Sequence, residues 1–346
     1  MTTSKKRELG DMKKYVILLI ALLLMLVVGC SKSKNETQTE NQAVKKGVFP
    51  LTGLEGEEID RRIISVMVNN HPKARPQTGL SQADLVFEIL AEGNITRFLA
   101  LYQSEAPEVV GPVRSAREYF FDLAERYQAI YIHHGAADFI SDMIKERGID
   151  SINGSNYDDD GYLFKRDHRR QAPHNSYLQF TAVRDIAEEK GYNLTETYEP
   201  LPFLTEEEIE QIEGDAAEQV EITYFNSPLT TVTYKYNTKK DVYERFSDGE
   251  QSVELESNEP IEMSNVLIIE ATHEVMDDQG RRKVDLDSGG QAYLLQKGIV
   301  QKLEWQSIDG RILPVKDGQP IGLIPGKTWI NVIPTSPGLE GAITVQ

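Results

Sequence analysis

The stretch "DLVFEILAEGNITRFLALY", residues 84–102, predicts two strands joined by a short turn. Both flanking segments, 84–90 and 96–102, are apolar runs of strand length, and the intervening "AEGN" supplies turn-forming Gly and Asn. A hairpin pairs its strands antiparallel, so a sheet that contains this segment has at least one antiparallel pair.

Helices are expected between the neighbouring strands. Residues 63–70 ("IISVMVNN") and 129–134 ("AIYIHH") predict strands, whereas apolar residues recur at helical spacing in 115–127. Two more helices are expected at 138–148 and 181–191, each ended by a glycine. Alternating strands and helices indicate an α/β region, and the hairpin makes its sheet mixed rather than all parallel.

The second half of the chain is richer in strands. Short β-prone runs such as "TVTYKY" and "TWINVIP" are separated by the turn signals "SDG", "DDQG" and "IDG". The fold class expected is therefore α+β, with a mixed-sheet α/β domain followed by a mainly antiparallel β-rich domain. The expected boundaries are 48–200 for the α/β domain, 201–214 for an acidic linker or helix, and 215–346 for the β-rich domain.

The N-terminal residues predict a targeting signal. A basic start and the 14-residue apolar run 15–28 predict a signal peptide over 1–29, because the run is too short to span a bilayer comfortably. "VVGC" resembles a bacterial lipobox, so Cys30 is the expected site of lipidation and the link to the cell membrane. The polar segment 30–47 lacks aromatic residues and predicts a flexible tether.

Charge and cysteine content exclude several functions. The 346-residue chain has a net charge of −18, and its first 29 residues carry +3 (five basic against two acidic), which leaves −21 for the remainder. Such a surface repels nucleic acid, so no nucleic-acid partner is expected. Cys30 is the single cysteine, so intramolecular disulfides and Cys-based metal sites are excluded. An anionic ligand must then be held by a local cluster of arginines.

The stretch "GPVRSAREYF", residues 111–120, predicts such a cluster. Arg114 and Arg117 flank Ser115 at the expected helix start, where free N–H groups and the helix dipole favour an anion. The alternative is structural, because Ser115 and Glu118 match a capping box that would satisfy the same N–H groups. Polar side chains near other strand ends could join this site, including Arg97 in "EGNITRF" and Asn175 in "APHNSY".

Two adjacent histidines, His133 and His134, end a predicted strand. Neighbouring strand residues point to opposite faces, so the pair is a poor joint metal site, and no HExxH motif occurs. We expect no metal and no cofactor. One histidine should pack in the sheet while the other, preferentially His133, lines a pocket shared with residues 111–117.

Taken in order, "SVMVNNHPKARPQTGLSQADLVFE", "EGNITRFLALY", "GPVRSAREYF", "AIYIHHG", "APHNSY" and "GKTWINVIP" resemble the YerB-like lipoproteins. This is a family of bacterial cell-surface proteins without an established activity, and the resemblance covers most of residues 50–335. It implies an α/β domain, a β-rich domain and a lipid anchor at the outer face of a Gram-positive cytoplasmic membrane. It implies no catalytic residue.

Three function classes remain open. The first is a lipid-anchored binding or regulatory protein of the cell envelope that holds an anionic ligand, such as a cell-wall fragment, and docks an envelope protein partner. The second is an envelope hydrolase or transferase with a histidine general acid/base beside a carboxylate. Its candidate residues are His133, His134, His174, Glu88 and Glu92. The third is a structural or interaction protein without a ligand.

Overall fold

The computed structural model describes residues 47–224 and 231–346, which belong to the compact unit Lys46–Gln346. The expected signal peptide, Cys30 and nearly all of the expected tether lie outside the described residues. Gly47, the last residue assigned to the tether, lies in strand β1 (Gly47–Val48), which pairs with β2 (Glu55–Gly56). Within the described ranges, no helix is long and apolar enough to cross a membrane.

The predicted hairpin is confirmed at the centre of the main sheet. Strands β4 (Leu85–Leu90) and β5 (Thr96–Tyr102) pair antiparallel with Leu85 opposite Leu101. On the far side of β5 the sheet continues with β3 (Ile64–Asn69), β7 (Ile130–His133) and β8 (Ser151–Asn153). Strand β3 is antiparallel to β5, whereas β3, β7 and β8 are mutually parallel, so the sheet is mixed as expected.

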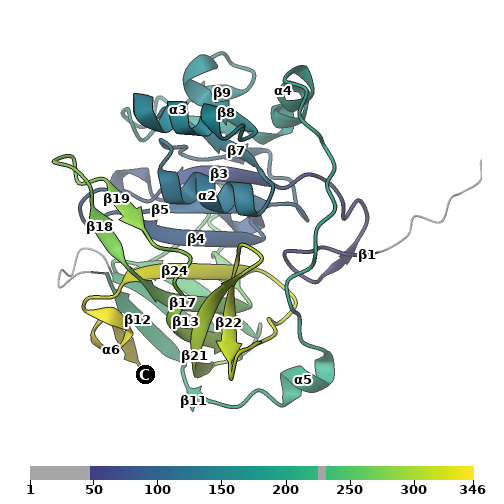
Figure 1. Cartoon of the computed structure of the whole chain (residues 1–346), viewed down its shortest axis with the longest axis vertical. Coiled ribbons are helices and arrows are strands. Elements are labelled where there is room, and N and C mark those ends of the chain that lie inside the picture. Colours follow the sequence, from purple (N-terminus) through teal and green to yellow (C-terminus); the bar gives the residue numbers. More distant parts are fainter. Residues whose placement is uncertain (1–46, 225–230) are drawn as a thin grey trace, which may run out of the picture. The chain divides into compact units, whose positions relative to one another are not determined.

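The same sheet continues into the C-terminal region through β24 (Thr328–Pro334), which pairs parallel with β4. Strand β17 (Asn265–Ala271) follows, again parallel. The antiparallel strands that complete this 12-stranded sheet are β20 (Gly290–Gln296), β21 (Ile299–Ile308), β22 (Arg311–Lys316), β23 (Gln319–Pro320) and β11 (Asp215–Ala216). Residues from both halves of the chain thus share one sheet (Figure 1).

A second, antiparallel sheet of six strands confirms the β-rich character of the C-terminal region. Its members are β12 (Gln219–Thr223), β13 (Thr231–Asn237), β14 (Val242–Ser247), β15 (Glu250–Gln251), β16 (Glu262–Met263) and β25 (Ile343–Val345). Smaller sheets are formed by β6 (Val109–Val110), β9 (Phe164–Arg166) and β10 (Ser176–Gln179), and by the hairpin β18 (His273–Val275) and β19 (Arg282–Val284).

The helices are α2 (Glu118–Arg126), α3 (Asp138–Glu146), α4 (Val183–Glu189), α5 (Glu206–Glu210) and α6 (Gly338–Ala342). Helices α2 to α5 fall in the segments where the sequence predicts them, with later starts for α2 and α4, whereas α6 was not predicted. Helix α5 occupies the acidic segment expected at 201–214, and Thr205 and Glu208 form a complete capping box at its start.

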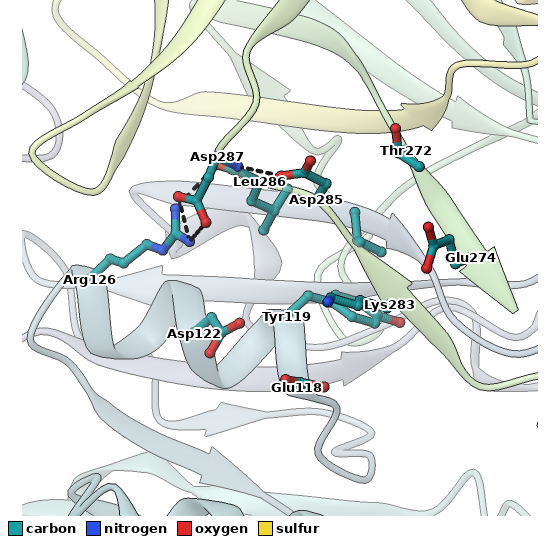
Figure 2. Close-up of a pocket in the computed structure, with 11 residues that line it drawn as sticks. Glu118, Tyr119, Asp122, Arg126, Thr272, Glu274, Lys283, Asp285, Leu286 and Asp287 are labelled. Carbon is teal, nitrogen blue, oxygen red and sulfur yellow. Dashed lines mark hydrogen bonds and ion pairs between the residues drawn. The ribbon is translucent and has the colours of Figure 1, made fainter. Parts of the chain in front are cut away.

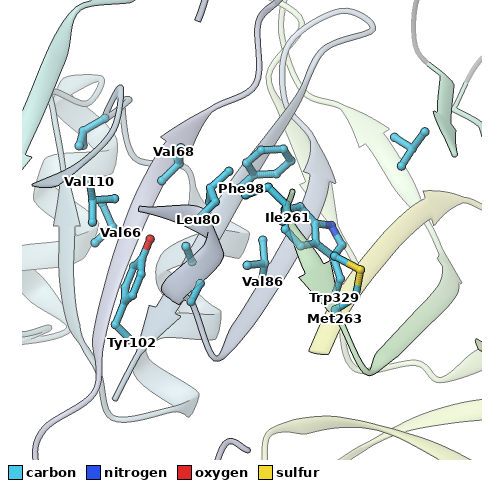
Figure 3. Packing of buried hydrophobic residues seen from close by; sticks show 14 of the residues in the cluster. Val66, Val68, Leu80, Val86, Phe98, Tyr102, Val110, Ile261, Met263 and Trp329 are labelled. Atoms are coloured by element: carbon cyan, nitrogen blue, oxygen red, sulfur yellow. The ribbon is translucent and has the colours of Figure 1, made fainter. Parts of the chain in front are cut away.

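The main sheet separates two hydrophobic cores, and strand alternation decides which side chains enter each. In β4, Leu85, Phe87 and Ile89 face the core covered by α2 and α3. Val86 and Leu90 face the opposite core, where the second sheet packs. Figure 3 shows Val86 in this core beside Phe98 and Trp329. Burying one such large side chain contributes roughly 1.5–3 kcal/mol, so both faces of the strand are strongly determined.

Candidate functional site

Residues 111–117 bind by their backbone to the ends of three strands. The Asn69 amide of β3 donates to the Pro112 carbonyl at 2.9 Å, and the Val113 amide donates to the Ser176 carbonyl of β10 at 2.7 Å. The His134 amide, just past β7, donates to the Arg114 carbonyl at 2.9 Å. These bonds bring four polar motifs that are distant in the sequence to one place.

Glu92 holds two of the three predicted arginines. Arg97 Nη2 donates to Glu92 Oε2 at 2.6 Å, and the Arg117 guanidinium binds the other carboxylate oxygen. Arg97 also donates to the Ser115 carbonyl at 3.0 Å, which ties the β4–β5 turn to residues 111–117. Burial would raise the pKa of Glu92, but Arg97 and Arg117 outweigh it and keep that pKa below its usual value.

Arg114 differs from the other two arginines. Its half-buried guanidinium has no hydrogen bond or ion pair to any residue in the described part of the chain. Burial lowers the pKa of Arg114, and the nearby charge of Arg117 lowers it further while Glu92 opposes. Burial lowers the pKa of Arg97 to about 10 as well. One carboxylate therefore faces three guanidinium groups, and the cluster keeps an excess of positive charge.

A pair of stacked histidines lies beside Arg114. The rings of His71 and His174 are 4.4 Å apart between centroids. Asn69 Nδ2 donates to His174 Nδ1 at 2.9 Å, and the Lys73 amide donates to His71 Nδ1 at 3.1 Å. Because each Nδ1 accepts a bond, each neutral ring carries its proton on Nε2.

Burial is the largest cause that lowers the pKa of His71 and His174, and the charge of Arg114 lowers both further. Both rings are therefore neutral at pH 7, and neither Nε2–H has a partner among the described residues. Arg114 and the two Nε2–H groups together offer unpaired donors, which is the chemistry that an anion requires.

His134 belongs to a neighbouring polar group. Arg166 donates to His134 Nε2 at 3.3 Å, so the neutral ring donates from Nδ1 to the Ser176 hydroxyl at 2.7 Å. Asp158 lies 3.9 Å from His134 Nε2 but is held by Arg166 at 2.7 Å. The serine accepts from the imidazole and is 2% exposed, so this Ser–His–Asp arrangement is not set up for nucleophilic attack.

Asn175 is buried, and its side-chain oxygen accepts from Arg166 Nη1 at 2.9 Å. It therefore helps to orient Arg166. Asn175 thus contacts the arginine that also donates to His134, and not Arg97 or Arg117.

His133 faces the opposite side of the strand, as alternation predicts. It is 2% exposed, its ring lies 5.2 Å from that of Tyr131, and Nδ1 donates to the Gly135 carbonyl at 3.0 Å. It lines a cavity, but that cavity contains no residue of 111–117, so the expectation of a pocket shared with that stretch was wrong. His134, rather than His133, contacts the polar side chains of Arg166 and Ser176.

The capping box expected at Ser115 was also wrong. Helix α2 begins at Glu118 with Arg117 as its N-cap, and no side chain caps it. Ser115 instead donates to the His134 carbonyl at 3.1 Å. The reason is tertiary: the backbone of residues 111–116 pairs with strand ends and holds Ser115 outside the helix, so the N-cap lies two residues later, at Arg117.

Glu88 lies within the protein, away from any histidine contact. Its side chain is 0% exposed and accepts bonds from Arg245 at 2.9 Å and from Trp329 Nε1 at 3.0 Å. Thr96 and Asn70 bind the same carboxylate at 2.8 and 3.3 Å. Neither Glu88 nor Glu92 contacts a histidine in the described ranges, so neither glutamate forms the carboxylate–histidine pair that the hydrolase or transferase hypothesis expects.

A separate cavity of about 340 Å³ lies between α2 and the β18–β19 hairpin (Figure 2). Its wall is mainly acidic, with Glu118, Asp122 and Glu274 facing Lys283, while Arg126 binds Asp287 at 2.9 Å. Asp122 is bound by Arg147. No group of three or more His, Cys, Asp or Glu in the described part of the chain could hold a metal ion.

Sequence reasoning missed the roles of Ser176 and Arg166 in orienting His134. Both residues lie in or beside the polar stretch 164–177, which signalled a dense loop without saying which side chain meets which. It also gave no reason to single out Arg114 from Arg97 and Arg117, because only the folded structure shows that Glu92 is shared by the other two.

The fold and this cluster define an α+β protein with a locally cationic site at the ends of β3, β7 and β10. Residues 51–193 match the family described as "Protein of unknown function (DUF3048) N-terminal domain", and residues 220–330 match the corresponding C-terminal domain. The chain belongs to this family.

Similar proteins support the assignment. The chain is 42% identical over 327 residues to the Bacillus subtilis (strain 168) protein described as "Putative lipoprotein YerB", covering 93% of this chain and 96% of the relative. It also matches the crystal structure of YerB protein from Bacillus subtilis, with a TM-score of 0.79 and 43% identity over 86% of this chain and 100% of the other. The resemblance to YerB-like lipoproteins is confirmed, and the relative's description agrees with the lipoprotein interpretation.

Proposed function

We propose that this protein is a lipid-anchored protein of the cell envelope that binds an anionic ligand through Arg114, in a binding or regulatory role in cell-wall biology. The observation that carries this proposal is the unpaired guanidinium of Arg114 next to two arginines that share one carboxylate. A partly desolvated cation without a counter-charge is costly. A bound carboxylate or phosphate would offset that cost.

The donors around Arg114 favour an oxyanion over other ligands. A guanidinium binds carboxylate or phosphate with two parallel hydrogen bonds, and the Nε2–H groups of His71 and His174 supply further donors. The remainder of the chain after residue 29 carries −21, so the general field repels anions and the local excess of positive charge must select them at short range. A fragment of an anionic cell-wall polymer fits these requirements.

The predicted targeting signal supports the same location at the cell envelope. We propose that residues 1–29 are a signal peptide, that lipid on Cys30 holds the protein at the outer face of a Gram-positive cytoplasmic membrane, and that residues 31–46 act as the tether. The regions 48–200 and 215–346 would then be the α/β and β-rich domains, joined by the acidic segment 201–214. The β-rich region would be the part that meets an envelope protein partner.

The ligand-free structural alternative is less well supported. It expects Arg114 and Arg117 to pair with acidic residues of the C-terminal region, whereas Arg117 pairs with Glu92 of the N-terminal region and Arg114 with no described residue.

The test compares the full chain with Arg114→Gln in a pull-down with purified bacterial sacculi. Losing the charge-assisted hydrogen bonds of one guanidinium costs about 1.5–3 kcal/mol, so binding should weaken at least about tenfold. The matched control is Arg184→Gln, which removes an exposed arginine whose ion pair with Glu188 is solvated. Sacculi stripped of phosphate polymers separate phosphate from carboxylate recognition. Equal binding by the wild-type protein and Arg114→Gln would contradict the proposal.

A further inference from the structure

A polar cavity of about 510 Å³ lies along the edge strand β8, between the end of α3 and the residues after α4, and it reaches from the start of β8 to the carboxyl ends of β7 and β8. Its wall includes His133, Ser141, Lys145, Asn153, Asn156 and Lys190. None of these residues belongs to the Arg114 cluster. In sheets with parallel strands, ligands bind beyond the carboxyl ends of the strands, which is where His133 and Asn153 lie.

His133 contributes a hydrogen-bond acceptor to this cavity. Its Nδ1–H donates to the Gly135 carbonyl, so the lone pair of the neutral ring is on Nε2. Burial lowers the pKa of His133 to about 4, so the ring stays neutral at pH 7. Nε2 has no partner in the described part of the chain, although the residue is 2% exposed. Nε2 opens onto the cavity, where a hydroxyl or amide N–H of a ligand can donate to it in place of water.

Asn153 contributes the complementary donor. Its Oδ1 accepts from the Gly135 amide at 2.9 Å and from the Ser155 amide at 3.0 Å, which fixes the side-chain orientation. Its Nδ2 group has no partner among the described residues. The cavity therefore presents one fixed acceptor and one fixed donor, the pattern that distinguishes hydroxyl-bearing ligands from simple ions.

The charge of the wall is positive. Asp150 is the carboxylate among the lining residues, and Arg62 neutralises it from outside the cavity at 2.9 Å. Lys145 and Lys190 have no carboxylate partner in the described ranges, and they remain exposed at the rim. The rim is thus cationic in a protein that is strongly acidic overall.

Apolar surface completes the wall through Ile144 and Ile149, which can contact the C–H face of a ring. The volume lies within the range of about 300–1,000 Å³ typical of small-molecule sites. We propose that this cavity binds an acidic mono- or disaccharide, with the lysines on its carboxylate or phosphate and His133 and Asn153 on its hydroxyl or acetamido groups.

The proposal is tested by isothermal titration calorimetry of the full chain in detergent. The probes are N-acetylmuramic acid, N-acetylglucosamine 6-phosphate, inorganic phosphate and uncharged N-acetylglucosamine. Either acidic sugar should bind at least tenfold more tightly than the uncharged sugar, and which one binds identifies carboxylate or phosphate as the recognised group.

Two variants test the residues. In His133→Asn, the amide can still donate to the Gly135 carbonyl but the Nε2 acceptor is lost, so binding of the acidic sugar should fall at least tenfold. Lys145→Gln/Lys190→Gln changes only exposed side chains, which keeps the test informative if His133→Asn does not fold. The matched control is Lys239→Gln/Lys316→Gln, which removes two exposed lysines that line none of the cavities described above.

Three results would overturn the proposal. They are the absence of heat with every sugar, equal affinity for the uncharged and acidic sugars, and inorganic phosphate binding as tightly as the sugar phosphate. Arg114→Gln should leave sugar binding at this cavity unchanged, because the two sites share no side chain. A negative calorimetry result for the cavity would therefore not affect the pull-down result for Arg114. Likewise, a negative pull-down result for Arg114 would not affect the calorimetry of the cavity.

Discussion

The buried ion pair between Glu88 and Arg245 should be the most sensitive polar contact of the fold. The two side chains are 0% and 2% exposed, and two guanidinium nitrogens reach the carboxylate at 2.9–3.2 Å. The ring centroids of Phe98 and Trp329 lie 5.1 and 5.0 Å from the guanidinium carbon, so little water can replace either partner. Removing one charge leaves the other buried and uncompensated.

We expect Glu88→Gln and Arg245→Met each to lower the free energy of unfolding by about 3–5 kcal/mol, the usual cost of breaking a buried pair. The double variant should cost clearly less than the sum of the two, because no unpaired charge remains. Since a domain is stable by only about 5–15 kcal/mol, either single variant should shift the urea midpoint strongly.

Urea unfolding of the full chain in detergent, followed by far-ultraviolet circular dichroism, measures these differences. Fluorescence is less suitable because Trp329 touches the altered carboxylate. Arg184→Met is the matched control, since its pair with Glu188 is exposed and should change stability by less than about 0.5 kcal/mol. If the two single-variant costs added to within about 0.5 kcal/mol in the double variant, the coupling argued here would be refuted.

Two further predictions concern pH and one backbone position. Burial is the main cause that lowers the pKa of His133 and His273 to about 4, so the unfolded chain, with a pKa near 6.5, takes up these protons first as the pH falls. The free energy of unfolding should therefore fall as the pH is lowered from 6.5 towards 4, and each histidine should account for a loss of about 2 kcal/mol by pH 4.5. His273→Asn should make the free energy of unfolding depend less steeply on pH. An unchanged pH dependence would be evidence against the burial argument. Gly135 has φ +79°, so Gly135→Ala should cost about 1–2 kcal/mol through backbone strain. It should also weaken sacculus binding, because the Gly135 carbonyl accepts from the Ala116 amide beside Arg114. The control is Gly318→Ala, at φ +77° in open space, which should cost similar stability and leave binding unchanged.

Much of the fold could be predicted because local patterns carry it. The alternating and continuous apolar runs of β3, β4, β5 and β7 are long enough to identify strands, and "AEGN" identifies the turn that makes the sheet mixed. Strand periodicity also separated His133 from His134 correctly. What alternation could not say is which face carries the cationic cluster, because that depends on where residues 111–117 pair after the chain has folded.

Glu88 is a second case in which local sequence patterns could not predict a contact. A carboxylate inside an apolar strand signals that it needs a partner, but the partner is 157 positions away in β14. No local pattern connects positions so far apart; the pairing exists because β4 and the second sheet face each other across one core.

The sequence by itself determined the lipobox-like "VVGC", the acidic charge and much of the order of strands and helices. Those features depend on composition and near-neighbour spacing. Only the tertiary structure decided that Glu92 pairs with Arg97 and Arg117 while Arg114 stays unpaired, and that His133 and His134 serve different surroundings. Long-range backbone pairing between strand ends makes those choices, and it is a property of the whole packed sheet rather than of any single segment.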